Sequence, residues 1–523
     1  MHMKRISIFL FFYLFFQSTF ASLWTDIGNY SISWYDKSKK SFVINTPEEL
    51  AGVAYLVNNN YTTFKNVTIV LGEDISLNEH EWNAIGTGIN SCFQGIFDGN
   101  NHSIYDVRMS QNSFKDKKYM GFFTCLIDAS VKNLYIQFED FTLQDVLSKE
   151  INIGKIAGYA EDCEIRNVST NGHFSWKTGK IISTINSNLN IGGLIGTIKK
   201  CTLYNCVNDV YSNMYIEIGS SNSLDYYKSV NIIIGGIVGH ADHELNFASL
   251  IYGCENNAGI EIITGSSHNG SPSVRMGGIA GFFVDNTRIE SCRNTAPFFK
   301  CKNKGNTVII ANIGGISGSN FTSPYCNGYI RNCYSSTTDI TYGVWLHSKA
   351  YLNYGGISAI YETGTNNLYS STFCPSDVII TPYNVGEDDI PLNIGFNSDN
   401  TFSADEMKSQ EFLDMLNEYS IIQEGKKIWE NKEIGKAFPS LIKNDNMTDI
   451  KSIMTEINTK PNYKISNKEL TIKSNGKVTV CNVEGRIVYS NVSYQGESIK
   501  LEEKGIYIVK CNDYCFKISI IDK

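Results

Sequence analysis

The sequence has no basic tract and, beyond residue 21, no apolar run long enough to cross a membrane. Its formal net charge is −8. Nucleic acids and anionic membrane surfaces attract clustered lysine and arginine, so both are poor partners for this chain. A membrane-spanning helix needs roughly 20 apolar residues. We therefore expect neither a nucleic-acid-binding protein nor an integral membrane protein.

Motifs that mark several kinds of catalytic or cofactor site are also missing. Neither glycine spacing that cradles phosphates, G-x-x-x-x-G-K-[ST] or G-x-G-x-x-G, occurs. A zinc protease needs H-E-x-x-H, and His80-Glu81 and His243-Glu244 both lack the second histidine. The set of Asn-Thr-Asp, Asp-Asp and Gly-His-Gly elements of polygalacturonase-like enzymes is not present. We therefore predict no catalytic residue, no cofactor-binding residue and no metal ligand.

The N-terminus has the pattern of a secretory signal peptide. Lys4 and Arg5 precede an apolar run over residues 6–16, and Thr19-Phe20-Ala21 resembles a cleavage site. The run is too short to span a bilayer. The first cysteine is Cys92, which argues against a bacterial lipid anchor. We expect export, with residues 1–21 removed.

What the sequence has in abundance is one glycine-rich motif, repeated. Counted from the second glycine or its equivalent, the copies are 34 to 43 residues apart. The five clear copies are NIGGLIGTI at 190–198, IIIGGIVGH at 232–240, RMGGIAGFF at 275–283, NIGGISGSN at 312–320 and NYGGISAIY at 353–361, and the two degenerate ones are YMGFFTCLI at 119–127 and NIGKIAGYA at 152–160. Such a period indicates a stacked repeat protein.

A second signature follows each glycine motif, as in IRNV at 165–168 and IRNC at 330–333. Its last position is held in turn by Leu134, Val168, Cys206, Cys254, Cys292, Cys333 and Ser371. Each repeat thus holds at least two short β-branched strands between turns. A coil of this kind buries its apolar face only by stacking on the next, with equivalent residues about 4.8 Å apart. The pattern predicts an all-β parallel β-solenoid.

Two consequences of the stacking concern glycine and cysteine. The paired glycines suit a sharp turn or close packing against the next coil. Stacking should place the last residues of the second signature in one inward-pointing column, which includes Cys206, Cys254, Cys292 and Cys333. We expect these four cysteines to be buried and reduced, because in-register neighbours on stacked coils have poor geometry for a disulfide.

The stretch HADHE brings four candidate metal ligands together: His240, Asp242, His243 and Glu244. In the repeat register His240 takes the place of Thr197, Phe282 and Ser319, which share no metal chemistry. The other three fall in an insertion, and insertions in solenoids form loops. A transition-metal site needs converging ligands at about 2.0–2.2 Å, which we do not expect here.

The two signatures together resemble the GLUG motif of bacterial surface proteins. FVINTPEELAGVAYLVN (42–58), TIVLGEDISL (68–77), EWNAIG (81–86) and FQGIFDGNNHSIYDV (93–107) are similar to the leader that precedes such repeats in secreted Bacteroidetes proteins. The likeness covers about residues 40–445. It implies a right-handed parallel β-helix on the surface of a Gram-negative cell, with adhesive or unassigned roles and no assigned active site.

Helical caps are expected at both ends of the solenoid. Thr46-Pro47-Glu48-Glu49 predicts a capped helix through Val57, and Ser403-Ala404-Asp405-Glu406 predicts another before Met407, Phe412, Leu413 and Leu416. The predicted boundaries are 1–21 for the signal peptide, 22–118 for the N-terminal cap and first coils, 119–375 for the repeats, 376–445 for the C-terminal cap, 446–467 for a linker and 468–523 for a small β-sandwich.

The C-terminal module resembles the sorting domain of type IX secretion cargo. The resemblance rests on VTVCNVEGRIVYSN (478–491), SIKL (498–501) and KGIYIVKCNDYCFKISIIDK (504–523), while KPNYKI at 460–465 only half matches the usual Pro-Asn-Pro start. The resemblance implies contact with secretion machinery. Whether Cys481, Cys511 and Cys515 include a disulfide is left open.

Two functions remain. We favour a non-catalytic adhesin or glycan/protein-binding scaffold, because exposed Tyr and Asn on a long solenoid face suit stacking on sugar rings and hydrogen bonding to hydroxyls, although most Phe and many Tyr are expected to fill the core. The alternative is a polysaccharide lyase or glycoside hydrolase, which needs two carboxylates roughly 5–10 Å apart. Its candidates, Glu387-Asp388-Asp389 and Glu139-Asp140, lie in segments expected to be solvated loops.

Overall fold

The computed structural model divides into two compact units, Met1–Ile442 and Lys443–Lys523. The described residues are 22–115, 118–144, 150–178, 187–218, 230–242, 248–264, 272–304, 309–321, 328–344, 350–362, 369–370, 372–383, 392–394, 400–424, 427–442, 463–466, 469–472, 476–482, 487–493, 498–501, 505–511 and 514–520. No helix among them is long and apolar enough to cross a membrane.

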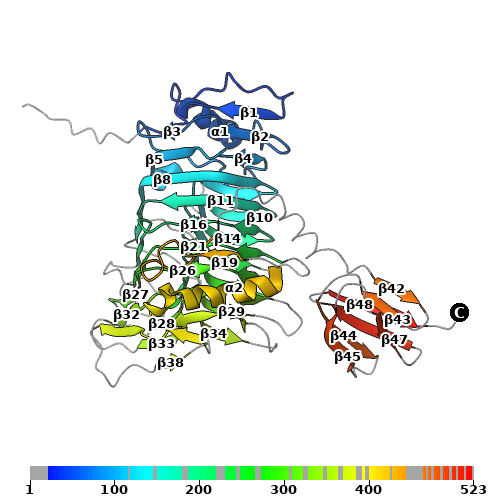
Figure 1. The fold of residues 1–523 in the computed structure, drawn as a ribbon. Coiled ribbons are helices and arrows are strands. Elements are labelled where there is room, and N and C mark those ends of the chain that lie inside the picture. Colours follow the sequence, from blue (N-terminus) through cyan, green and yellow to red (C-terminus); the bar gives the residue numbers. More distant parts are fainter. Residues whose placement is uncertain are drawn as a thin grey trace, which may run out of the picture. The chain divides into compact units, whose positions relative to one another are not determined.

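In the first unit, parallel strands stack into long sheets (Figure 1). The first sheet contains β6 (Tyr119–Met120), β9 (Glu150–Gly154), β13 (Ser187–Gly192), β18 (Val230–Gly235), β23 (Ser273–Gly277), β28 (Ile309–Gly314), β33 (Ala350–Gly355) and β38 (Leu392–Ile394). The second sheet contains β7 (Phe123–Ile127), β10 (Ala157–Glu161), β14 (Ile195–Lys199), β19 (Val238–Asp242), β24 (Ala280–Val284), β29 (Ser317–Phe321) and β34 (Ser358–Glu362).

The third sheet is broader, because each coil contributes several short strands to it. It begins with β1 (Ser41–Ile44), β2 (Thr68–Leu71), β3 (Ile75–Ser76), β4 (Ile96–Asp98), β5 (Ser103–Met109), β8 (Ser130–Gln144), β11 (Glu164–Asn171) and β12 (Phe174–Thr178). It continues with β15 (Thr202–Tyr204), β16 (Val207–Asn208), β17 (Met214–Ile218), β20 (Leu250–Tyr252), β21 (Glu255–Asn256), β22 (Ile260–Thr264), β25 (Arg288–Glu290), β26 (Arg293–Asn294) and β27 (Phe298–Asn303). It ends with β30 (Tyr329–Arg331), β31 (Tyr334–Ser335), β32 (Asp339–Val344), β35 (Tyr369–Ser370), β36 (Phe373–Pro375), β37 (Ile379–Tyr383) and β39 (Asn400–Phe402).

Equivalent repeat positions are in register. Gly192 pairs with Gly235, and Gly235 pairs with Gly277. In the second sheet His240 lies between Thr197 and Phe282, as the repeat alignment predicts. The unit is therefore an all-β structure with the parallel stacking of a β-helix, and the handedness inferred from the resemblance stays a prediction.

The repeated glycines are required by close packing rather than by backbone conformation. None of the described repeat glycines has a positive φ. A Cβ on Gly236 would lie 2.2 Å from the Asn256 Cγ atom and 2.2 Å from the Gly278 carbonyl oxygen. A Cβ on Gly196 would lie 2.5 Å from the Ile153 nitrogen in the first sheet of the preceding coil. Of the two roles expected for these glycines, the structure supports packing against the next coil.

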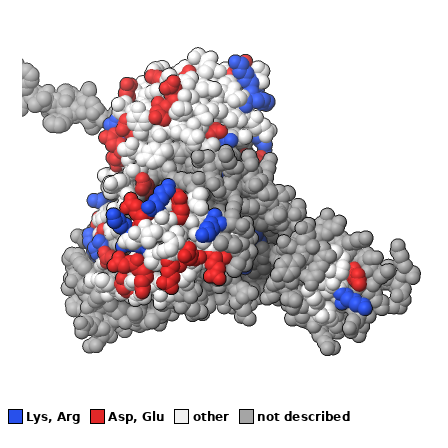
Figure 2. All heavy atoms as spheres, in the orientation of Figure 1, with Lys and Arg blue, Asp and Glu red and all other residues white. Residues whose placement is uncertain are grey.

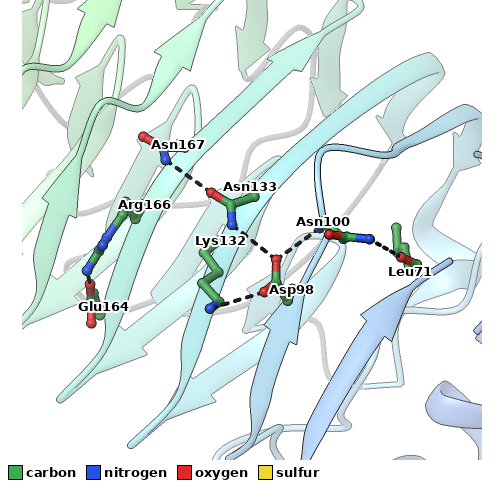
Figure 3. A network of polar contacts seen from close by, with 8 residues as sticks. All are labelled: Leu71, Asp98, Asn100, Lys132, Asn133, Glu164, Arg166 and Asn167. Atoms are coloured by element: carbon green, nitrogen blue, oxygen red, sulfur yellow. Dashed lines mark hydrogen bonds and ion pairs between the residues drawn. The ribbon is translucent and has the colours of Figure 1, made fainter. Parts of the chain in front are cut away.

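The asparagine of the second signature forms a corner of the coil. Asn133, Asn167 and Asn205 have φ values of 52°, 51° and 52°, a left-handed conformation that asparagine tolerates better than most residues. Their amides link the coils, since Asn167 Nδ2 donates to Asn133 Oδ1 at 3.0 Å and Asn133 Nδ2 donates to Asp98 at 3.1 Å (Figure 3). Asn100 also donates to the Leu71 carbonyl (Figure 3).

The predicted cysteine column is confirmed. Cys206, Cys254, Cys292 and Cys333 are fully buried free thiols. The Cys254 backbone N–H donates to Cys292 Sγ at 3.4 Å, and the Cys292 N–H donates to Cys333 Sγ at 3.3 Å. Cysteine thus packs as a small apolar side chain in the interior of the stack.

The first predicted helix is present as α1 (Pro47–Asn58), with Thr46 as its N-cap. Thr46 Oγ1 accepts from the Glu49 N–H at 3.3 Å, while the Glu49 carboxylate accepts from the Asn45 N–H at 2.8 Å. The apolar face, from Leu50 to Val57, is buried. Whether α1 shields the end of the stack stays a prediction.

The second predicted helix lies elsewhere than expected. Strands β37, β38 and β39 pair in parallel with earlier coils, so the stack continues past residue 376, where the cap was predicted to begin. The 3₁₀ helix η2 (Glu406–Lys408) and α2 (Gln410–Glu424) then pack against the side of the coils (Figure 1). We call residues 403–442 the side segment; it also holds β40 (Trp429–Glu430) and β41 (Ser440–Leu441).

The side segment covers one outward row of the third sheet. In register this row is Glu255, Arg293, Tyr334 and Phe373. Phe412 of α2 contacts the rings of Tyr334 and Phe373, and the Ser420 hydroxyl hydrogen-bonds to the Asn332 side chain at 3.0 Å. Acidic side chains gather on the face seen in Figure 2, and exposed ones on the side segment are Asp405, Glu406, Glu411, Asp414 and Glu418.

The second unit is antiparallel. One sheet contains β42 (Tyr463–Ser466), β43 (Glu469–Ile472) and β46 (Ser498–Lys500), and the other contains β44 (Gly476–Asn482), β45 (Ile487–Ser493), β47 (Gly505–Cys511) and β48 (Tyr514–Ile520). Because β42 is part of the first of these sheets, the ordered strands begin inside the segment predicted to be a linker.

Candidate functional site

The candidate site is a seam where the outward side chains of the first two sheets meet. Thr197 of the second sheet donates its hydroxyl to Asn152 Oδ1 of the first sheet at 2.6 Å. The glycine at position 196 lets the two strands approach this closely. We define the seam by Tyr119, Asn152, Asn190, Ile233, Arg275, Asn312 and Asn353 on the first sheet and Tyr159, Thr197, His240, Phe282 and Ser319 on the second.

An aromatic platform occupies the middle of the seam. The rings of His240 and Phe282 stack with centroids 5.4 Å apart and an interplanar angle of 21°. The Arg275 guanidinium lies 5.0 Å from the Phe282 ring centroid. All three side chains are partly exposed. The platform therefore offers a flat apolar surface beside a cation, which suits stacking against a planar or ring-shaped ligand.

Amide and hydroxyl groups surround the platform. Asn190 Nδ2 donates to Asn152 Oδ1 at 2.9 Å, and Asn353 Nδ2 donates to Asn312 Oδ1 at 2.7 Å. Within the described residues, Asn190 Oδ1 and Ser319 Oγ are buried without a hydrogen-bond partner. Buried polar atoms in proteins are nearly always satisfied. These two atoms therefore have capacity for a further hydrogen bond, but both lie beneath the surface of the seam.

The charged side chains at the edge of the seam already have hydrogen-bond or ion-pair partners. Glu161 accepts from the Tyr159 hydroxyl at 2.9 Å and from Lys199 Nζ at 3.1 Å. Burial, followed by the bond to Glu161, raises the pKa of Tyr159 well above its usual range. Tyr159 is thus a neutral hydrogen-bond donor, and the Glu161 carboxylate already accepts from Tyr159 and Lys199. This part of the seam can bind polar groups but does not present a free acid and base pair.

The histidine-rich stretch is only partly described. His240 lies in the seam and Asp242 follows it at the end of β19, whereas His243 and Glu244 lie outside the described residues. The described residues contain no group of three or more His, Cys, Asp or Glu side chains placed to hold a metal ion.

The other residues considered in the sequence have structural partners. His80 Nδ1 is 2.6 Å from Ser22 Oγ, and the Glu81 carboxylate accepts from Ser110 at 2.9 Å. Glu139 pairs with Arg108 at 3.4 Å, and Asp140 accepts from Thr142. Glu387-Asp388-Asp389 lies outside the described residues.

Two features of the site were not predicted from the sequence. One is which outward rows of the first two sheets lie side by side, and the other is a buried lysine. Nothing in the repeat period says which outward rows meet, so Arg275 and Asn190 could not be grouped with His240. Lys155 carried a usable signal, because it replaces the second glycine in the copy at 152–160.

No family model matches the sequence, and no curated protein matches it. The similar solved structures include two with informative descriptions. One is described as a candidate immunoglobulin A1 protease from Bacteroides ovatus, with 16% identity and a TM-score of 0.35, covering 78% of this chain and 93% of that one. The other is named IgA1 protease, with 16% identity and a TM-score of 0.36, covering 65% of this chain and 22% of that one. The stacked sheets themselves place the first unit among proteins with a parallel β-helix-like fold.

Proposed function

We propose that this chain is an exported or surface-displayed β-helix that binds a glycan along the seam and performs no catalysis. The observation that carries the proposal is the partly exposed His240–Phe282 platform with the Arg275 guanidinium beside it, in a seam that also carries asparagine side chains such as Asn353. Ring stacking with a few placed hydrogen-bonding groups is how proteins orient small polar ligands. Arg275 adds a cation that would favour acidic sugars.

The N-terminal pattern and the two resemblances support the location. A signal peptide over residues 1–21, GLUG-like repeats and a module like a type IX sorting domain together suit export to the surface of a Gram-negative cell. The two antiparallel sheets of the second unit are compatible with the small β-sandwich of the proposed sorting module. In this proposal the first unit binds and the second contacts the secretion machinery.

The binding proposal is tested with a glycan array and a panel of host-matrix proteins, using the full chain. Phe282→Ala and Arg275→Met should each weaken binding at least about tenfold, since each removes a contact of the platform. The matched control is Tyr211→Ala, an exposed aromatic residue outside the seam (67% exposed). Unchanged glycan binding in Phe282→Ala would contradict the site, and binding only to matrix proteins would replace the glycan by a protein ligand.

The alternative function, a polysaccharide lyase or hydrolase, gives a different readout. Glycans bound in the array are incubated with the protein, and their length and reducing ends are measured. We expect both to stay constant. Shortened products that disappear on changing acidic residues would establish an enzyme.

Export through the second unit is tested by truncation after Asp445. We expect the thermal transition of the first unit to remain, because the two units are separately compact. Surface display should be lost. Display that survives the truncation would show that the second unit is not the sorting signal.

A further inference from the structure

A ladder of buried amides runs through the stack behind the glycine pairs. Asn208 Nδ2 donates to Asn256 Oδ1 at 3.0 Å, and Asn256 Nδ2 donates to Asn294 Oδ1 at 2.9 Å. Asn294 then donates to the Ser335 and Thr337 hydroxyls at 3.1 and 2.9 Å. Each step between two asparagines uses one N–H and one carbonyl oxygen, so the carbonyl oxygen of the first one, Asn208, accepts from no other member of the ladder.

A buried lysine occupies that end. Lys155 belongs to the coil that precedes the coil of Asn208, and it is equivalent to Gly193 in the repeat. In that preceding coil the residue that pairs with Asn208 is Thr170, whose side chain is shorter. Lys155 is 1% exposed, and its Nζ atom lies 3.4 Å from Asn208 Oδ1. Asn208 is fully buried. The amine of Lys155 and the carboxamide of Asn208 are thus held next to each other in the buried interior.

We propose that Lys155 and Asn208 form an intramolecular isopeptide bond that covalently joins two coils. The Nζ lone pair attacks Asn208 Cγ, so that a new C–N bond forms and the Cγ–Nδ2 bond breaks. One proton moves from Nζ to Nδ2, and the nitrogen of the former side-chain amide leaves as ammonia. No oxidant, reductant or co-reactant is needed, because the step exchanges one amide for another.

The surroundings supply the conditions for this step. Burial lowers the pKa of Lys155 well below its usual range, which provides the neutral amine that can attack. Asp209 follows Asn208 in the chain, and its charge acts on Lys155. The proton passes from Nζ to the leaving nitrogen within the tetrahedral intermediate, so no other side chain has to gain or lose one. The product is a secondary amide that keeps one N–H.

The test is peptide mapping of the full-length protein. A bonded Lys155 resists trypsin, so residues 150–166 should appear joined to residues 201–228. The joined mass should be about 17 Da below the sum of the two peptides, the mass of one ammonia. Ammonia loss at Asn208 without joining would indicate a succinimide and would overturn the proposal. So would cleavage after Lys155 that yields residues 150–155 and 156–166 with both partners unmodified.

Variants assign the bond to its residues. Lys155→Met and Asn208→Ala should each abolish the joined peptide. The matched control is Lys199→Met, which removes a lysine of the neighbouring coil that pairs with Glu161 and should leave the joined peptide intact. Because the decisive measurement uses the unmodified sequence, a variant that fails to fold does not affect it. A joined peptide that persists in Lys155→Met would assign the bond to another lysine.

Discussion

Glu255 and Arg293 form an ion pair between successive coils, with 2.7 Å between a carboxylate oxygen and a guanidinium nitrogen. The pair lies beneath the side segment, because the same guanidinium donates to the Pro439 carbonyl at 2.9 Å. The side chains of Arg293 and Glu255 are only 14% and 10% exposed. The pair therefore connects the stack to the segment that covers it.

Replacing Arg293 should loosen that segment. Arg293→Met leaves the Glu255 carboxylate buried without its partner, which costs about 3–5 kcal/mol in typical buried pairs. It also removes the donor to Pro439. We expect trypsin to cut after Lys436 faster than in the unmodified protein. Lys302→Met, which breaks a pair with Glu261 at 3.0 Å, serves as the control and should not change that rate. An equal cleavage rate in Arg293→Met would mean that aromatic packing alone holds the segment.

The amide ladder should respond to a change in its middle. Asn256→Ala leaves Asn208 Nδ2 without its partner and removes the bonds of Asn256 to the Ala258 N–H and carbonyl, whereas Asn294 Oδ1 keeps the Ala296 N–H at 3.3 Å. Each buried unsatisfied group costs about 1–3 kcal/mol, so chemical denaturation should show a loss of about 3 kcal/mol. The control is Asn231→Ala, which removes a hydrogen bond to Asn188 that is exposed to solvent. Its cost should stay near about 0.5 kcal/mol. Equal losses would show that the ladder adds nothing beyond an ordinary surface bond.

The stacking of this fold could be predicted from the sequence, because residues one repeat apart in a solenoid become paired neighbours in adjacent coils. Once Gly192, Gly235 and Gly277 are equivalent, every residue near them has a known neighbour in the next coil. The pairing of His240 with Thr197 and Phe282 followed in this way and is confirmed. The buried cysteines followed from the same alignment.

The position of the side segment could not be predicted in the same way. The apolar residues Met407, Phe412 and Leu416 show that η2 and α2 bury one face, but such a face fits the end of a stack as well as its side. The deciding contacts involve Tyr334 and Phe373, which look like ordinary strand residues in the sequence. The seam was missed for a related reason, since the two sheets approach each other through backbone contacts at Gly196 and its equivalents, which the sequence does not show.

The cysteine column gives a chemical test of the interior. Because Cys206, Cys254, Cys292 and Cys333 are fully buried, a thiol reagent should leave them unlabelled in the native protein and label them after unfolding. Cys292→Arg should destabilise the stack by several kcal/mol, since it would place an unpaired charge in the interior. Peptide mapping of the labelled protein identifies the sites. Rapid labelling of all four in the native state would contradict this packing.

Stability should also fall in alkaline solution, with one traceable contribution from Cys301. Burial raises the pKa of this thiol from 9.0 to about 12. Above pH 9 the unfolded chain releases the proton while the folded chain keeps it. The unfolded state then binds fewer protons, and the free energy of unfolding falls as pH rises. The contribution of Cys301 is complete below pH 9 and is lost progressively up to about pH 12.

The measurement is denaturant unfolding at a series of pH values on either side of pH 9. Cys301→Ala should flatten the decline by up to about 1.4 kcal/mol per pH unit, the value for one proton. The control is Ile262→Val, because Ile262 pairs with Cys301 in the register and is equally buried. It should lower stability by about 1 kcal/mol at every pH and leave the slope unchanged. Buried Tyr334, whose pKa burial raises to about 12, is present in both variants and cancels in the comparison. If Cys301→Ala and Ile262→Val show the same slope, the thiol of Cys301 already ionises freely in the folded protein and is not buried as described.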